Sequence, residues 1–415
     1  MKNILFGFLL LFYFCGSQAQ GVISSISFEG NKTTKASYLL YFIKSEVGGM
    51  LDSTLLETDR QQLANLEVLS DAQYKVKKGA DGYEITFQCQ ELFTLLPILN
   101  FGRIDENFWI LAGATHVNLL GKGHKVYAYY QHYDRSSYAF NISLDRLKGS
   151  PWGVNLNLVK WGTLEPLYFD GKQVDYNYNN HTYGVEGVYR FDFFNKVLLG
   201  ASYFNEYYKA VSPLVEGAPA RANKDKILIK SLYECNRVNH FFFYQSGFSN
   251  TLNFQTVFSL DGDPTFHIAF NDFKYFERIG KKGNLATRVR VGLSSNQASP
   301  FAPFVLDSYL NIRGVGNRVD RGTGVIVGNV EYRHSFIDRN KIAVQGVAFS
   351  DLGTWRNPGG GLENFVDEDN MVWFGGIGAR IIHKKIYNAI LRIDYGFNFQ
   401  NLGGNGLVFG VGQYF

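Results

Sequence analysis

The sequence has few of the features that mark most enzymes and helical membrane proteins. Its 415 residues include only 9 prolines and 3 methionines, and 19% of them are charged, against about 25% in ordinary soluble domains. Beyond residue 19 there is no run of about 20 apolar residues, so no transmembrane helix is expected. The motifs of serine hydrolases, zinc proteases and P-loop proteins do not occur. We therefore predict that the protein is not an enzyme.

The polar residues also do not group into a metal or nucleic-acid site. The eight histidines are dispersed, and the two later cysteines, Cys89 and Cys235, lack metal-site spacing. The formal net charge is +4, and the basic residues are scattered along the chain, whereas nucleic-acid binders cluster them. We expect no metal, no cofactor and no nucleic-acid partner, and we expect the two thiols to be inert and buried.

The first 19 residues differ from the rest of the chain. Lys2 precedes an almost wholly apolar run from Ile4 to Phe14, and Ser17-Gln18-Ala19 has the small-x-small pattern of a cleavage site. Cys15 lacks the preceding small residues that lipidation requires. The pattern predicts a secretory signal peptide over residues 1–19, which is too short to span a membrane as a helix.

Residues 20–93 have the pattern of a small mixed domain. Strands are expected at 22–28, 72–77 and 83–90, and helices at 36–44 and 52–69, which gives the order β-α-α-β-β. Thr34 is predicted to cap the first helix. Gly30 and Asn31 suit a turn that needs a positive φ, and we expect this turn to be structural.

Residues 94–415 are rich in aromatic residues and glycine, which together favour strands and turns. The whole chain holds 36 Phe, 26 Tyr, 5 Trp and 44 Gly. Runs of about ten residues alternate between apolar side chains and Gly, Asn or charged ones, as in 389–399. We count sixteen such runs, an even number as in bacterial outer-membrane barrels. A soluble sandwich would bury the apolar face, but the signal peptide and the lack of a second packing layer favour an antiparallel transmembrane β-barrel. The protein is thus predicted to be mainly β.

The longest gap between expected strands is 296–323, between the eleventh and the twelfth. It contains several prolines and glycines and no apolar periodicity. A loop of this length in a compact fold is usually functional or disordered.

Four short motifs occur in a fixed order along the chain. They are Ile26-Ser27-Phe28-Glu29-Gly30-Asn31 with the later Thr34, Gly49, Asp59, Leu63 and Leu66; Asn311-Ile312-Arg313-Gly314; Phe349-Ser350-Asp351-Leu352-Gly353; and the final Phe415. The first resembles a POTRA domain. Together they resemble the BamA/TamA superfamily of outer-membrane assembly proteins over essentially the whole chain beyond the signal peptide. Two departures are that Val315 stands where the family usually has an aromatic residue, and that there is only one POTRA unit.

The resemblance implies that the long loop turns back into the barrel and is pinned there. Its Arg313, followed by Gly314, would pair with Glu331 and Asp351 on the wall, because a guanidinium can bind a carboxylate through two hydrogen bonds. Period-two alternation places Glu331 on the same face as Val327, Asn329 and Arg333, which we interpret as the lumenal face.

The expected seam of the barrel joins its first and last strands. The first strand contains Pro97, and the last one, predicted over 406–415, contains Gly410 and Gly412, so the pairing should be weak. Phe415 ends a strand that resembles the signal by which barrels are directed to the assembly machinery. Tyr414 and Phe415 are also expected in an aromatic belt at the membrane interface.

The resemblance implies an outer-membrane location with the POTRA domain in the periplasm. The expected function is insertion of other outer-membrane proteins through an opening seam, with nascent barrels, outer-membrane lipids and accessory lipoproteins as partners. An alternative is a two-partner-secretion transporter that passes one secreted polypeptide through its lumen. A structural or passive-porin role is the second alternative.

Overall fold

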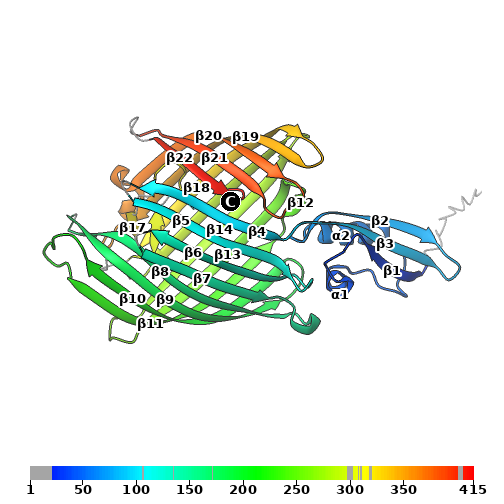
Figure 1. The fold of residues 1–415 in the computed structure, drawn as a ribbon, viewed down its shortest axis with the longest axis horizontal. Helices are drawn as coiled ribbons and strands as arrows, with labels where there is room; N and C mark the ends of the chain where they lie inside the picture. Colours follow the sequence, from blue (N-terminus) through cyan, green and yellow to red (C-terminus); the bar gives the residue numbers. More distant parts are fainter. Residues whose placement is uncertain are drawn as a thin grey trace, which may run out of the picture.

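A computed structural model describes residues 21–415 apart from 105–106, 134, 171, 297–301, 307, 309–310, 317–319 and 401–404. The predicted signal peptide lies outside the described residues. The chain forms a small N-terminal domain and a large β-barrel, which follow one another along the long axis of the molecule (Figure 1). Among the described residues, no helix combines the length and the apolar character needed to cross a bilayer.

The N-terminal domain has two helical segments on one side of a three-stranded sheet. The strand order is β1-β3-β2, with β1 parallel and β2 antiparallel to β3. The elements are β1 (Ile23–Glu29), α1 (Ala36–Leu39), η1 (Leu40–Phe42), α2 (Ser53–Ala64), β2 (Leu69–Lys78) and β3 (Tyr83–Glu91). The predicted order β-α-α-β-β is therefore the order that the structure has.

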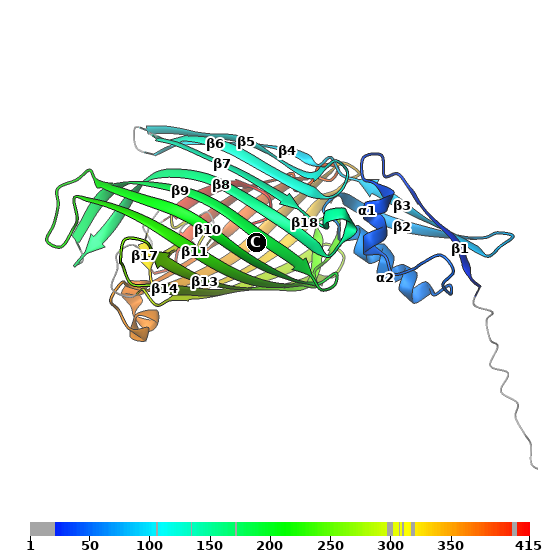
Figure 2. The same cartoon turned by 90° about the horizontal axis from the view of Figure 1, so that it is seen from below.

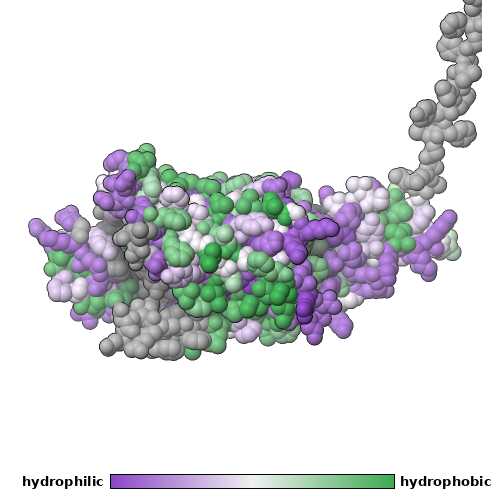
Figure 3. Space-filling model, turned by 90° about the horizontal axis from the view of Figure 1, so that it is seen from above, coloured by the Kyte–Doolittle hydropathy of each residue, from purple (hydrophilic) through white to green (hydrophobic). Residues whose placement is uncertain are grey.

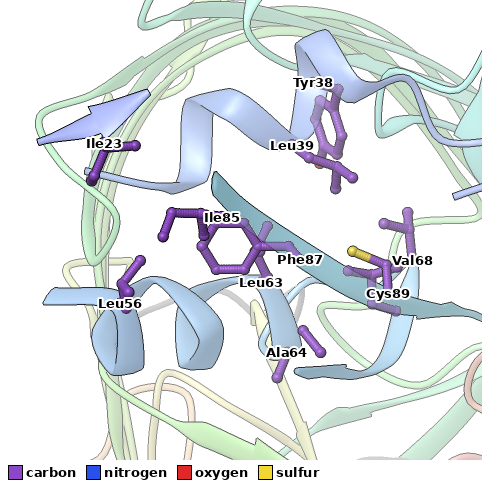
Figure 4. Close-up of a cluster of buried hydrophobic side chains, with 12 residues drawn as sticks. Ile23, Tyr38, Leu39, Leu56, Leu63, Ala64, Val68, Ile85, Phe87 and Cys89 are labelled. Atoms are coloured by element: carbon purple, nitrogen blue, oxygen red, sulfur yellow. The ribbon is translucent and has the colours of Figure 1, made fainter. Parts of the chain in front are cut away.

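The core of this domain lies between the helices and the sheet. Leu56 and Leu63 of α2 face Ile85 and Phe87 of β3, and all four are almost completely buried (Figure 4). Cys89 is part of the same core, and burial raises the pKa of its thiol to about 12. This thiol is therefore protonated at neutral pH, and the half-buried Cys235 is also free.

The start of the domain differs from the prediction in two details. The helix predicted over 36–44 is α1 followed directly by the 3-10 turn η1, which ends at Phe42. Thr34 does not cap it: the N-cap residue is Lys35, and the Thr34 hydroxyl accepts a hydrogen bond from Asn118 of the barrel. Gly30 has a φ of +85°, as predicted for the turn, but Asn31 is not among the residues with positive φ. The Asn31 side chain closes the turn by donating to the carbonyl of Thr34 (2.9 Å).

We predict that residues 21–93 fold alone when expressed as a soluble fragment. The fragment contains a complete apolar core, and about 70 residues is enough for independent folding. Circular dichroism should show a mixed helix and strand spectrum that melts cooperatively. Leu63→Ala should lower the stability by about 2–5 kcal/mol. A fragment with the spectrum of an unfolded chain would show that the domain needs the barrel to fold.

The barrel is built from sixteen of the described strands, each antiparallel to the next along the chain. They are β4 (Leu95–Ile104), β5 (Asn107–Leu119), β6 (His124–Tyr133), β7 (Arg135–Leu144), β8 (Trp152–Phe169), β9 (Lys172–Arg190), β10 (Asn195–Ala210), β11 (Arg221–Asn236), β13 (Tyr244–Ser259), β14 (Phe266–Ile279), β15 (Gly283–Ser294), β18 (Gly324–Asp338), β19 (Ile342–Arg356), β20 (Met371–His383), β21 (Ile390–Asn398) and β22 (Asn405–Val411). The short elements are η2 (Leu147–Gly149), β12 (Asn239–Phe241), β16 (Phe304–Leu306), β17 (Asp320–Gly322), η3 (Leu362–Val366) and η4 (Glu368–Asn370). The predicted fold class is confirmed.

The order of strands returns from β22 to β4, so that the sheet curls into a barrel (Figure 1). A residue-by-residue register is described for each consecutive pair of wall strands, from β4–β5 to β21–β22. Between β22 and β4 no such register is described. This pair is the seam.

The sequence pattern predicts strands over 152–161 and 181–192, but β8 and β9 have 18 and 19 residues and also include 162–169 and 172–180. Their far ends project, together with those of β10 and β11, beyond the other strands of the barrel (Figure 1). The apolar side chains there, Val174 and Tyr176 of β9, pack inward against Leu167 and Tyr208. The apolar side chains of β9 therefore face inward in this part, whereas Leu164 and Tyr168 of β8 are exposed.

The wall of the barrel is apolar outside and polar inside. Along β18, Val330 and Tyr332 are 48% and 38% exposed, whereas Asn329, Glu331 and Arg333 are at most 1% exposed. Figure 3 shows hydrophobic side chains around the middle of the barrel and hydrophilic ones toward its ends and over the N-terminal domain. This is the arrangement of a transmembrane β-barrel, in which the apolar side chains face lipid.

The N-terminal domain lies over one end of the barrel, which we call the near mouth (Figure 2). On one side the Lys35 amide donates to the carbonyl of Gly121 (2.9 Å), and the ring of Phe42 stacks on Phe193 in the turn between β9 and β10. The guanidinium of Arg146 lies 5.1 Å from the centre of the Phe42 ring. Three turns of the barrel therefore hold the α1–η1 side of the domain.

The other side of the domain is held by polar contacts after α2. The Asn65 side chain donates to Asn239 (3.0 Å) and accepts from the His240 amide (2.9 Å), and Glu67 forms an ion pair with Lys125 (2.5 Å). Burial and the neighbouring Glu67 carboxylate raise the pKa of Tyr387, in the turn between β20 and β21. The domain thus contacts turns around much of the near mouth.

Candidate functional site

The long loop between β15 and β18 returns into the lumen, as the resemblance implied. Its short strands β16 and β17 pair with each other. Leu306 and Ile312 of the loop are buried against Val325, Val327 and Trp355 on the lumenal side of β18 and β19. These apolar contacts bring the segment 311–314 onto the wall.

Arg313 is held by both predicted carboxylates. Its Nε and Nη2 donate to the two oxygens of Asp351, each at 2.8 Å, and its backbone amide donates to Asp351 Oδ2 (3.0 Å). Nη1 donates to Glu331 Oε2. None of the three side chains has exposed surface (0%). The predicted pinning contacts are therefore present, and they form the centre of the site.

Further polar residues of the wall extend this network. Asn329, which faces Asp351 across the β18–β19 pair, donates to Asp351 Oδ1 (2.8 Å) and to the Asn311 carbonyl (2.9 Å). Arg333 donates to the second oxygen of Glu331. Arg380 of β20 pairs with Asp394 of β21 (2.7 Å) and lies 3.7 Å from Glu331. Loop and wall are joined by one continuous network of charged side chains.

This network makes the loop position specific, because each charge depends on its partners. A buried ion pair gains little over a well-packed apolar pair, but removal of one partner leaves a charge without compensation and costs about 3–5 kcal/mol. Among the described residues, Arg313 is the side chain that donates to both carboxylates, and it does so only when it lies between them. The loop therefore has one strongly preferred position in the lumen.

Glycines of β21 and β22 allow the loop to approach the wall closely. A Cβ atom on Gly396 would lie 2.6 Å from the carbonyl oxygen of Arg313, and one on Gly406 would lie 2.3 Å from that of Gly314. The two glycines face each other across the β21–β22 pair. Gly314 has a φ of +94°, which other residues rarely adopt. Gly314 thus contributes to the site in two ways: its backbone adopts a positive φ, and it lets the loop lie directly against Gly396 and Gly406 of the wall.

The guanidinium of Arg313 also lies between two aromatic rings. The ring centres of Phe349 and Tyr414 are 3.8 Å and 4.4 Å away from it. Val315, at the position where an aromatic residue was expected, is partly buried in the apolar cluster of the loop. Cation–π contacts of this kind are strongest where water is excluded.

The predictions for the end of the chain need correction. β22 stops at Val411 rather than continuing to Phe415, because Gly412 turns the chain with a φ of +88°. Tyr414 is 5% exposed, and its hydroxyl donates to the Ser308 carbonyl of the loop (3.3 Å). Phe415 packs on Val238 and Phe276. Both rings lie in the lumen and not in an aromatic belt. We call residues 412–415 the tail.

The seam has the features predicted for a weak closure. β22 has seven residues, against nine in β21 and ten in β4. Pro97 is paired with Ala114 of β5, and its missing amide removes one donor from β4. Gly410 lies beneath the guanidinium of Arg392, with which it is paired across β21 and β22.

Several arginines of the lumen were not singled out from the sequence. Arg288 of β15 is buried and donates to Asn329 (2.9 Å), and Arg392 of β21 is 3% exposed. They share the period-two alternation of Glu331 and Asp394. That alternation places the arginine side chains on the lumenal face, but it does not show which side chains they contact there.

Comparison with known proteins identifies the N-terminal domain and finds solved structures with a similar overall fold. A family model for the POTRA domain, described as a surface antigen variable number repeat, matches residues 21–91. These residues form a POTRA domain. No curated protein sequence matches the chain.

The fold of the whole chain is similar to three solved structures. BamA from Haemophilus ducreyi lacking POTRA domains 1-3 has a TM-score of 0.56 and 15% identity over 94% of this chain and 83% of that one. CdiB from Acinetobacter baumannii has a TM-score of 0.58 and 12% identity over 94% of this chain and 73% of that one. CdiB from Escherichia coli has a TM-score of 0.59 and 13% identity over 94% of this chain and 75% of that one. The predicted resemblance to the BamA/TamA superfamily is thus confirmed for the POTRA domain and for the fold.

Proposed function

We propose that the protein inserts other β-barrel proteins into the outer membrane, and that the barrel lies in that membrane with its POTRA domain in the periplasm. The observation that carries this proposal is the seam. It joins a seven-residue β22 to a β4 that contains Pro97, at the point where the tail leaves the wall. The apolar band around the barrel supports the membrane location.

The physical task of such a protein is to satisfy the backbone of an incoming strand. An unpaired amide or carbonyl in lipid costs several kcal/mol, so a strand cannot enter the bilayer alone. A seam that opens offers the free edges of β4 and β22 as partners. The pinned loop keeps β18 to β20, on the β22 side of the seam, in a fixed arrangement while the seam moves. No covalent chemistry is needed, and we propose no enzymatic role.

The second candidate function is transport of one secreted polypeptide through the lumen, as in a two-partner-secretion transporter. The similarity of the fold to CdiB favours it as much as the similarity to BamA favours insertion. In this structure the lumen holds the loop and the tail, and the POTRA domain lies over the near mouth. A transported chain would have to displace all three, whereas a seam mechanism leaves the loop where it is.

Depletion of the protein, followed by a quantitative inventory of the outer membrane and the secreted proteins, separates the two functions. We expect a broad loss of β-barrel proteins. Complementation with the wild-type gene should restore them, and complementation with an Arg313→Ala gene should not. Loss of a single secreted protein with an unchanged set of barrels would overturn the insertion proposal in favour of transport.

A further inference from the structure

We propose that a group of arginines in the lumen is a binding site for a polypeptide segment with two successive aromatic residues, and that the tail of this chain fills it in the present structure. The group, which we call the arginine cage, surrounds residues 413–415 from four strands and the long loop. Its members are Arg288, Arg313, Arg333, Arg380 and Arg392. The inference rests on the proposed function, because it specifies what an incoming polypeptide would offer.

The cage holds the ring of Tyr414 most closely. The guanidinium groups of Arg313, Arg392 and Arg288 lie 4.4, 4.7 and 5.7 Å from the ring centre. The tyrosine hydroxyl reaches the carbonyl of Ser308 (3.3 Å). An aromatic ring with a polar tip therefore satisfies this position through its face and its end.

The neighbouring residues of the tail offer acceptors to the other arginines. Arg380 Nε donates to the side-chain oxygen of Gln413 (3.3 Å), and Arg333 Nη2 donates to the backbone oxygen of Phe415 (3.2 Å). The ring of Phe415 is 5.4 Å from the Arg288 guanidinium. Each of the three tail residues thus matches a donor or a cation of the cage.

The cage also has binding capacity that the tail does not use. Its five guanidinium groups are accompanied by the side-chain carboxylates of Glu331, Asp351 and Asp394, so positive charge is in excess among these eight side chains. Arg392 is 3% exposed, and its Nε and Nη1 atoms have no hydrogen-bond partner among the described residues. A segment with further acceptors beside its aromatic rings would satisfy these donors.

The tail is attached in a way that allows exchange. Its described backbone contact with the sheet is one hydrogen bond, from the Gly412 amide to the Ile390 carbonyl (2.8 Å). Beyond it, a cavity of about 360 Å³ between the POTRA domain and the near mouth is lined by Gln413 and Phe415. A polypeptide that arrives from the POTRA side would meet the tail at this cavity.

The test is binding of a labelled peptide to the purified full-length protein in detergent. The probe is Val-Gly-Gln-Tyr-Phe, the sequence of residues 411–415, and the control peptide has leucine in place of both aromatic residues. A variant with Tyr414→Ala and Phe415→Ala empties the cage. If the tail fills it nine-tenths of the time in the wild type, the variant should bind the probe about tenfold more tightly. Fluorescence anisotropy measures both affinities.

Two further variants make the result specific. Arg392→Gln in the emptied background should weaken binding of the probe, because it removes one of the cations that face the ring. Tyr414→Leu, which keeps most of the side-chain volume, replaces the double variant if heat-modifiable gel mobility shows that the latter does not fold. Equal binding of both peptides, or equal binding of the probe by wild type and emptied cage, would overturn the proposal.

The outcome is independent of the insertion experiment. Binding in detergent needs no membrane and no client protein. If the cage binds the probe but depletion of the protein leaves the outer-membrane barrels unchanged, the binding site is supported and the insertion proposal is refuted. If the probe does not bind but depletion causes a broad loss of barrels, the binding site is refuted and the insertion proposal is supported.

Discussion

Replacing Arg313 with alanine is expected to release the long loop from the barrel wall. The change removes two hydrogen bonds to Asp351 and one to Glu331, in a region with no exposed surface. The backbone amide and Asn329 still donate to Asp351, and Arg333 still donates to Glu331, but the guanidinium that joins the two buried carboxylates is lost. The expected loss is about 3–5 kcal/mol. It should appear as altered heat-modifiable gel mobility and as protease cleavage within 295–323.

Two other variants serve as comparisons. Arg339→Ala removes an exposed arginine in the turn between β18 and β19 and should change neither mobility nor cleavage. Asp351→Asn keeps the shape and one acceptor oxygen and should give a related but milder loss than Arg313→Ala. If the Arg313→Ala protein retained wild-type protease resistance and activity, the loop would not depend on this contact.

The pinning contact could be predicted because it depends on local patterns. Period-two alternation placed Asn329 and Glu331 on the lumenal face, and the resemblance indicated Asp351. The strand pairing that sets Asn329 opposite Asp351 brings the two carboxylates together. The resemblance supplied Arg313 as their partner. The same alternation predicted the number of wall strands and the apolar outer face.

The parts that could not be predicted depend on contacts between distant segments. Thr34 has the usual character of a helix cap, but its partner is Asn118, 84 residues away. The alternation of the last strand continued toward Phe415, yet Gly412 turns the chain and Tyr414 meets arginines from other strands. Nothing in a local pattern shows which lumenal arginine lies beside which ring.

The second large effect concerns the seam, which should stop function when it is locked. Insertion through the seam requires β22 and β4 to separate, and a disulfide between them would prevent this without changing the rest of the barrel. Leu95 and Leu99 of β4 and Phe409 and Val411 of β22 are all exposed on the outer face. Cysteine pairs among these positions are therefore scanned for oxidation, which needs Cα atoms within about 7 Å. Cys89 and Cys235 are first replaced by serine.

A matched control places the same bond where no opening is expected. Leu391 and Val411 are directly paired across β21 and β22. A disulfide between cysteines at these positions adds the same chemistry to the same strand but leaves the seam free. Heat-modifiable mobility of the oxidised proteins shows whether both variants are folded.

The most direct measurement is the rate at which the purified, oxidised seam variant inserts an unfolded β-barrel protein into lipid vesicles. The account predicts that the locked seam reduces insertion to the level of vesicles without the protein, that reduction of the disulfide restores it, and that the β21–β22 control inserts at the wild-type rate. Unchanged insertion by a folded protein with a fully locked seam would contradict the account.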